Sequence, residues 1–127
     1  HRDLHSFPTR RSSDLMESLA LKYRSAVEGL GKITGRKVPV LHIVGGGCKN
    51  TILSQYTANV LKCPVTAGPV EATAIGNVMC QLIALKEVED LKQAREVVKH
   101  SFPTEQYTPR NAGLWDEAYS QYLSILK

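Results

Sequence analysis

Three consecutive glycines form the stretch of this 127-residue chain with the clearest capacity for chemistry. Gly45, Gly46 and Gly47 come directly after an apolar run over residues 40–44. Because they lack Cβ atoms, they let backbone N–H groups approach a ligand closely and adopt positive φ without steric cost. A helix beginning just after them would add unpaired N–H groups and the positive end of its dipole. The pattern therefore favours a site for a phosphate or a nucleotide.

An ordinary tight turn explains the same glycines equally well, and two known nucleotide motifs are excluded. The dinucleotide fingerprint needs a third glycine where this chain has Asn50. The phosphate-binding loop needs Gly-Lys-Ser/Thr where this chain has Cys48-Lys49-Asn50. A nucleotide that binds here must therefore be held in another family's way.

Asn50 has two possible roles at the start of the helix that follows. Its side chain can cap that helix by accepting from an N–H group two or three residues further on. Its amide also carries both a donor and an acceptor, which could pair with the edge of a purine. The sequence leaves both roles open.

Apolar periodicity predicts the elements that must position these residues. The predicted order is helix 16–30, strand 40–44, helix 50–62, strand 64–67, helix 68–88, helix 91–98 and, after a loop over 101–113, helix 114–126. The expected inward faces are Leu19, Tyr23, Ala26, Val27 and Leu30 in the first helix, Ile52, Leu53, Tyr56 and Val60 in the second, and Ala72, Ile75, Val78, Met79, Leu82 and Ile83 in the third. A helix joins the two strands, so they are expected to be parallel and the fold class to be α/β. Two strands do not make a stable sheet alone, which indicates part of a domain.

Composition and charge narrow the class of protein. An apolar content of 43% with 22% charged residues is typical of a globular protein, and no apolar run reaches the roughly 18 residues of a membrane span. The net charge of +4 is spread along the chain, so nucleic acid is not expected as a partner. Cys48, Cys63 and Cys80 are odd in number and show no metal-binding spacing, which predicts packed, reduced thiols in a cytoplasmic protein. Cys48 is a weaker redox candidate because it lies near a helix start.

Residues 1–15 differ in composition from the rest and lack helical or alternating apolar periodicity. They resemble translated adapter sequence, and we expect a non-native or disordered leader without function. The domain is predicted to cover residues 16–127.

Two stretches of the chain together resemble the FGGY carbohydrate kinases. LHIVGGGCKNTILSQYTANVL resembles the glycine turn and following helix of their C-terminal nucleotide-binding domain, and GPVEATAIGN resembles the branch of the family that phosphorylates L-rhamnulose. Other members usually carry a pattern closer to E-x-x-A-L-G-A-A where this chain has Glu71 to Asn77. That departure favours the L-rhamnulose branch, and a member acting on xylulose or gluconate is the alternative within the family.

The resemblance implies an incomplete actin-like, ribonuclease-H-like ATPase domain that binds ATP and Mg²⁺. It places Gly45, Gly46 and Gly47 against the nucleotide and Asn50 beside the adenine. It also implies that the aspartate base and most sugar contacts lie upstream of the part matched here, since Glu71, Asp90 and Asp116 do not match that base. The chain alone is therefore expected to lack kinase activity. A non-catalytic α/β module that binds a nucleotide or another anion is the alternative from a different class.

Overall fold

The computed structural model describes residues 6–126, and side chains from residue 13 onward. Its elements, in chain order, are α1 (Ser6–Thr34), β1 (Leu41–Ile43), the 3-10 helix η1 (Gly46–Lys49), α2 (Thr51–Leu61), β2 (Val65–Ala67), α3 (Ala72–Ala84), α4 (Leu91–Ser101), β3 (Glu105–Tyr107) and α5 (Ala112–Ile125). The predicted α/β class is confirmed. None of the helices within residues 6–126 combines the length and apolar character that crossing a membrane requires.

The strands form one small sheet in the order β1-β2-β3. β1 and β2 are parallel, as predicted, with Leu41 opposite Val65. β3 is antiparallel to β2, with Tyr107 opposite Val65. The expected loop over 101–113 is thus wrong in part: β3 pairs through its backbone, and its polar sequence gives no alternating apolar signal to reveal it.

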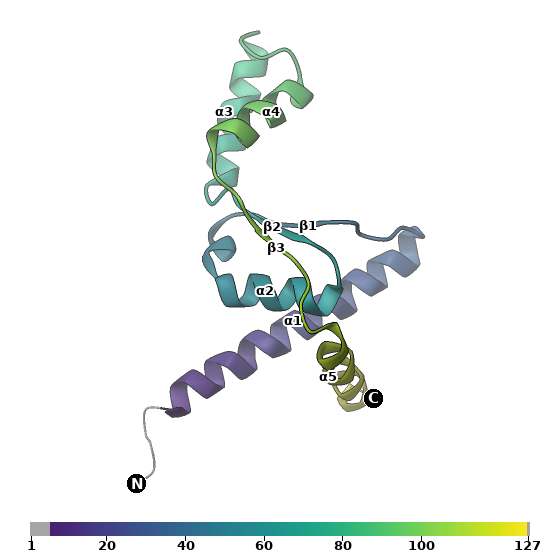
Figure 1. The fold of residues 1–127 in the computed structure, drawn as a ribbon. Coiled ribbons are helices and arrows are strands. Elements are labelled where there is room, and N and C mark those ends of the chain that lie inside the picture. The colour runs from purple at the N-terminus through teal and green to yellow at the C-terminus, as the bar shows by residue number, and fades with distance from the viewer. Residues whose placement is uncertain (1–5, 127) are drawn as a thin grey trace.

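α2 lies along one side of this sheet, and α1 crosses beyond it with α5 close by (Figure 1). α3 and α4 form a hairpin that projects away from the sheet. α1 packs against α2 and α5, which identifies the three-helix side as the main body of the fold.

The main core lies between α1, α2 and α5. Its buried members are Ala20, Leu21, Val60 and Tyr119, with Leu53, Tyr56, Leu61, Trp115, Ala118 and Tyr122 packed around them. The ring centroids of Tyr56 and Trp115 are 4.9 Å apart, so Trp115 is a packing residue of this core.

Several sequence-based predictions of the helices need correction. α1 begins at Ser6 rather than near residue 16, and its buried face contains Ala20 and Leu21 instead of Tyr23 and Leu30. Crossing contacts with α2 and α5 select that face, which periodicity within one helix does not reveal. The assignment of residues 1–15 as a leader outside the domain stays a prediction, and residues 1–5 lie outside the described part.

Three further side chains are more exposed than predicted. Ile52 on α2 and Val78 on α3 are 54% and 50% exposed, because no described element covers those sides of the two helices. Cys80 is also exposed, whereas Cys48 and Cys63 are buried as expected. Burial raises the pKa of the Cys63 thiol, which keeps it in the protonated, unreactive form.

A cluster of charged side chains ties α5 to α1 and α2. The Asp116 carboxylate accepts from Arg24 Nη1 at 2.7 Å and pairs with Lys62 Nζ at 2.5 Å. Arg24 also donates to Glu28 at 2.8 Å, and its guanidinium lies 4.1 Å from the centre of the Tyr119 ring. The hydroxyl of Tyr119 donates to the second Glu28 oxygen at 2.8 Å. The cluster therefore joins three helices through side chains far apart in the sequence.

The same contacts set the ionisation of the two carboxyl groups. Hydrogen bonds from Lys62 and then Arg24 lower the pKa of Asp116. Burial of Glu28 opposes its ionisation, but hydrogen bonds from Arg24 and Tyr119 outweigh burial and lower its pKa as well. The folded pKa values of both groups lie below their unfolded values, so their stabilising contribution is present above the unfolded values of about 4 and is lost as pH falls through the folded ones.

Asp116→Asn is therefore expected to lower the urea midpoint of unfolding at neutral pH. The difference from the unsubstituted chain should stay constant from about pH 8 to about pH 5 and shrink below about pH 4, where Asp116 itself becomes protonated. Glu117→Gln is the matched control, since Glu117 lies exposed on the same helix and forms no ion pair among the described residues. A pH-independent difference would contradict the role of the Asp116 charge.

Candidate nucleotide-binding corner

The glycine turn lies where β1 ends and α2 is about to begin, and it is held in place by its backbone. Gly45 adopts φ +80°, a conformation that glycine adopts at no steric cost. Its N–H donates to the Pro69 carbonyl at 3.1 Å, and its own carbonyl accepts from the Cys48 N–H at 3.1 Å. The next residues form η1, in which Cys48 is buried. One side of the turn is thus held by a hydrogen bond to the segment that follows β2.

The other side of the turn is open. Gly46 and Gly47 are exposed, and a Cβ atom added to either would meet no atom within 4 Å. The corner is therefore neither enclosed in the protein nor covered by a described side chain. A ligand could lie directly against its main chain, which an ordinary buried turn would not permit.

The two glycine turns at this end of the sheet lie next to each other. Because β1 and β2 are parallel, their carboxyl ends meet at one edge. Gly68, directly after β2, donates from its N–H to the carbonyl of Ile43 at 2.8 Å. The contribution of Pro69 and Gly68 to the corner was not predicted: the predicted helix begins at residue 68, whereas α3 begins at Ala72. A ligand-binding crevice beyond the carboxyl ends of parallel strands is the general arrangement in open α/β sheets.

Asn50 caps α2. Its Oδ1 accepts from the Leu53 N–H at 3.0 Å, and its Nδ2 lies 3.1 Å from the sulfur of Met16 on α1. The capping role considered for Asn50 is confirmed. One Nδ2 hydrogen and one Oδ1 lone pair remain available to another group, so its contact with a purine stays a prediction.

An apolar cavity of about 440 Å³ lies between α3 and α4 and adjoins the glycine corner. Val44 directly precedes the glycine turn, and the Pro69 carbonyl accepts the hydrogen bond from the Gly45 N–H. Both residues line this cavity, together with Ala72, Ile75 and Met79. The corner thus combines bare backbone with nearby apolar surface, a usual composition for a small-molecule site.

Acidic side chains contribute little to the corner. Asp90 caps α4, accepting from the Gln93 N–H at 2.8 Å, and Asp116 belongs to the charged cluster. Glu71 occupies the N-cap position of α3 but makes no capping bond with its side chain. Among the described residues, no three His, Cys, Asp or Glu side chains gather into a possible metal centre.

The chain thus combines an α/β fold with an open glycine corner at the carboxyl end of its first strand. Residues 14–85 match the C-terminal domain of the FGGY family of carbohydrate kinases. The chain belongs to this family, and its fold is consistent with part of a ribonuclease-H-like domain.

Three curated relatives carry the name rhamnulokinase. The chain is 42% identical over 113 residues to that of Bacteroides thetaiotaomicron, a match covering 89% of this chain and 23% of the relative. It is 48% identical over 105 residues to that of Pectobacterium carotovorum, covering 80% and 21%. It is 45% identical over 97 residues to the rhamnulokinase of Bacillus subtilis, a match covering 76% of this chain and 20% of the relative. The chain therefore spans between a fifth and a quarter of the length of these relatives.

Proposed function

We propose that this chain is the ATP-binding part of a carbohydrate kinase that transfers the γ-phosphoryl group of ATP to the 1-hydroxyl of L-rhamnulose, giving L-rhamnulose 1-phosphate and ADP. The observation that carries the proposal is the open, side-chain-free corner at Gly45, Gly46 and Gly47. Relatives that bear the name rhamnulokinase support the choice of sugar.

The corner suits the part of the reaction assigned to it. Phosphoryl transfer depends mainly on positioning the nucleotide and neutralising charge, rather than on covalent chemistry by the protein. Bare backbone at Gly46 and Gly47 lets the nucleotide approach the N–H groups at the start of η1 and α2. Mg²⁺, when bound to the phosphates, supplies charge neutralisation. In a rhamnose-degrading enzyme this step would take place in the cytoplasm.

The sugar site and the catalytic base are proposed to lie outside these residues. Two aspartates of the chain have structural roles: Asp90 caps a helix, and Asp116 joins three helices. The chain alone is accordingly expected to bind ATP weakly and to transfer no phosphate.

A phosphorylation assay on the complete protein tests the proposed reaction. With ATP and Mg²⁺, L-rhamnulose should be phosphorylated with a kcat/KM at least about tenfold above the values for D-xylulose and D-gluconate, since a site built to hydrogen-bond particular hydroxyls rejects sugars that leave them unpaired. The 127-residue chain assayed alongside should show no turnover. Equal activity on all three sugars would point to another FGGY kinase, and binding of ATP without turnover of any sugar would favour the non-catalytic module.

A further inference from the structure

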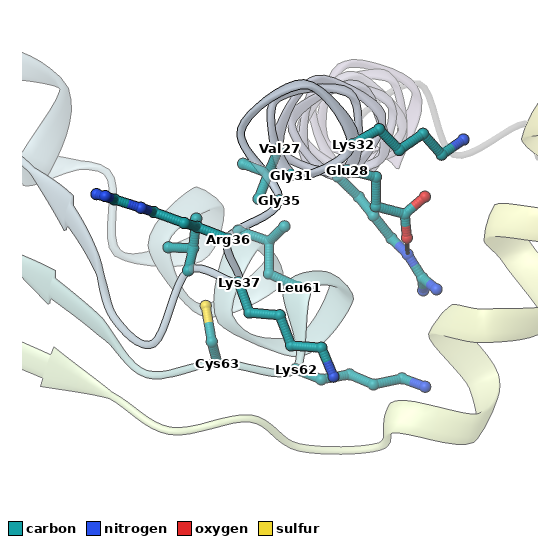
Figure 2. A pocket seen from close by; sticks show the side chains of 12 residues that line it. Val27, Glu28, Gly31, Lys32, Gly35, Arg36, Lys37, Leu61, Lys62 and Cys63 are labelled. Atoms are coloured by element: carbon teal, nitrogen blue, oxygen red, sulfur yellow. Dashed lines mark hydrogen bonds and ion pairs between the residues drawn. The ribbon is translucent and has the colours of Figure 1, made fainter.

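A second cavity lies at the other end of β1, away from the glycine corner. It has a volume of about 660 Å³ and is lined by residues from the end of α1, the segment that leads into β1, and the end of α2 (Figure 2). Residues 31–38 approach the amino end of β1, whereas the glycine corner follows its carboxyl end. The two sites are therefore separated by the length of the strand.

The lining of this cavity, here called the basic cavity, is strongly positive. Five cationic side chains and one carboxylate line it: Arg24, Lys32, Arg36, Lys37, Lys62 and Glu28. Their formal charge of +4 equals the net charge of the whole chain, so the remainder of the chain is formally neutral. Cations that are spread along the sequence are thus brought together at this cavity by the fold.

Compensation of helix ends accounts for only part of this charge. α1 and α2 both end at the cavity, and each carboxyl end carries the equivalent of about −0.5 charge. Asp116, which pairs with Arg24 and Lys62, subtracts one more charge. After these contributions, roughly two positive charges of the cavity lining remain uncompensated. Among the described residues, Lys32, Arg36 and Lys37 form no ion pair.

The floor of the basic cavity is apolar. Val27, Val38 and Leu61 contribute to it, and the side chain of Cys63 lies beside them. In Figure 2 the side chains of Lys32, Arg36 and Lys37 fan out from different sides of the rim. Lysine ammonium groups on flexible four-carbon stems can fold over an anion seated in the cavity. A ligand that matches both features has a phosphate group and a carbon body.

We propose that the basic cavity binds a small organic phosphate, such as a phosphorylated sugar, at a site separate from the glycine corner. The volume lies within the usual range for small-molecule sites. A phosphate monoester carries between one and two negative charges at neutral pH, which matches the uncompensated positive charge. The site would let the protein respond to phosphorylated metabolites independently of the nucleotide.

Calorimetric titration of the 127-residue chain with glucose 6-phosphate tests this site. Binding should weaken as ionic strength rises from about 0.01 M to about 0.15 M, because the Debye length falls from about 30 Å to about 8 Å. Glucose should bind at least about tenfold more weakly because it lacks the charge, and inorganic phosphate should also bind more weakly because it gains nothing from the apolar floor. Equal affinities for inorganic phosphate and glucose 6-phosphate would overturn the organic class of ligand.

Paired variants locate the binding. Arg36→Gln combined with Lys37→Gln should lower the affinity for glucose 6-phosphate about tenfold, and both side chains are exposed, so the fold should be retained. Lys92→Gln combined with Lys99→Gln removes the same charge from exposed positions on α4 and should leave the affinity unchanged. Equal losses in the two pairs, or no binding by the unsubstituted chain, would overturn the proposal. Gly46→Val should leave glucose 6-phosphate binding intact, which separates this site from the nucleotide site.

Discussion

Gly46→Val is expected to raise the KM for ATP of the complete kinase at least about tenfold while leaving the KM for the sugar nearly unchanged. The physical reason is the open side of the glycine corner. A Cβ atom at residue 46 would meet no protein atom within 4 Å, so we expect the valine side chain to occupy space proposed for the nucleotide rather than to disturb the fold. Its effect on the free energy of unfolding should remain within about 0.5 kcal/mol, as for other surface substitutions.

The control for this variant is Gly113→Val. Gly113 is also exposed, has no atom within 4 Å of its Cβ position, and lies in α5 away from the corner. It should leave both KM values unchanged. Steady-state kinetics with each substrate varied in turn make the comparison. An equal rise in both KM values for Gly46→Val would count against placing the nucleotide on this turn.

Gly68→Ala is expected to destabilise the 127-residue chain by roughly 2–3 kcal/mol, a large part of a typical domain's 5–15 kcal/mol. Gly68 has φ +112°, which an alanine adopts only with strain. Its new Cβ would also lie 3.1 Å from the carbonyl oxygen of Pro103 and 3.5 Å from Thr104. The closest contact, with the Pro103 carbonyl oxygen, is made by backbone, which cannot move aside as a flexible side chain would.

Gly76→Ala makes the same chemical change but is expected to stabilise the chain rather than destabilise it. Gly76 lies inside α3, and its Cβ position has no neighbour within 4 Å. Alanine there should stabilise the chain by up to about 1 kcal/mol through helix propensity. Urea unfolding of both variants measures the difference. If Gly68→Ala proved as stable as the unsubstituted chain, the close approach between Gly68 and the segment before β3 would be wrong.

The sequence alone predicts local features of this fold well. The parallel pairing of β1 and β2 follows from the helix that joins them. The glycine corner and the cap at Asn50 follow from residue types within a few positions of each other. The cap at Asp90 follows from the same kind of signal. Such features depend on local backbone chemistry, which a single sequence records directly.

Features that depend on distant contacts could not be predicted. β3 has no alternating pattern and is defined only by its pairing with β2. Arg24 and Glu28 have the four-residue spacing of a helical ion pair, but nothing in the sequence indicates that Asp116 completes the cluster. The basic cavity likewise draws its cations from three helix or loop segments that only the fold brings together.

The hairpin of α3 and α4 has a further consequence for how the chain fluctuates. α3 contains no fully buried residue, and Ala94 is the buried residue of α4, so the two helices rely mainly on each other. Opening this hairpin therefore does not require the α1–α2–α5 core to separate. Backbone amides of α3 should exchange with solvent deuterium through local fluctuations, whereas amides around Val60 on α2 should exchange only through global unfolding.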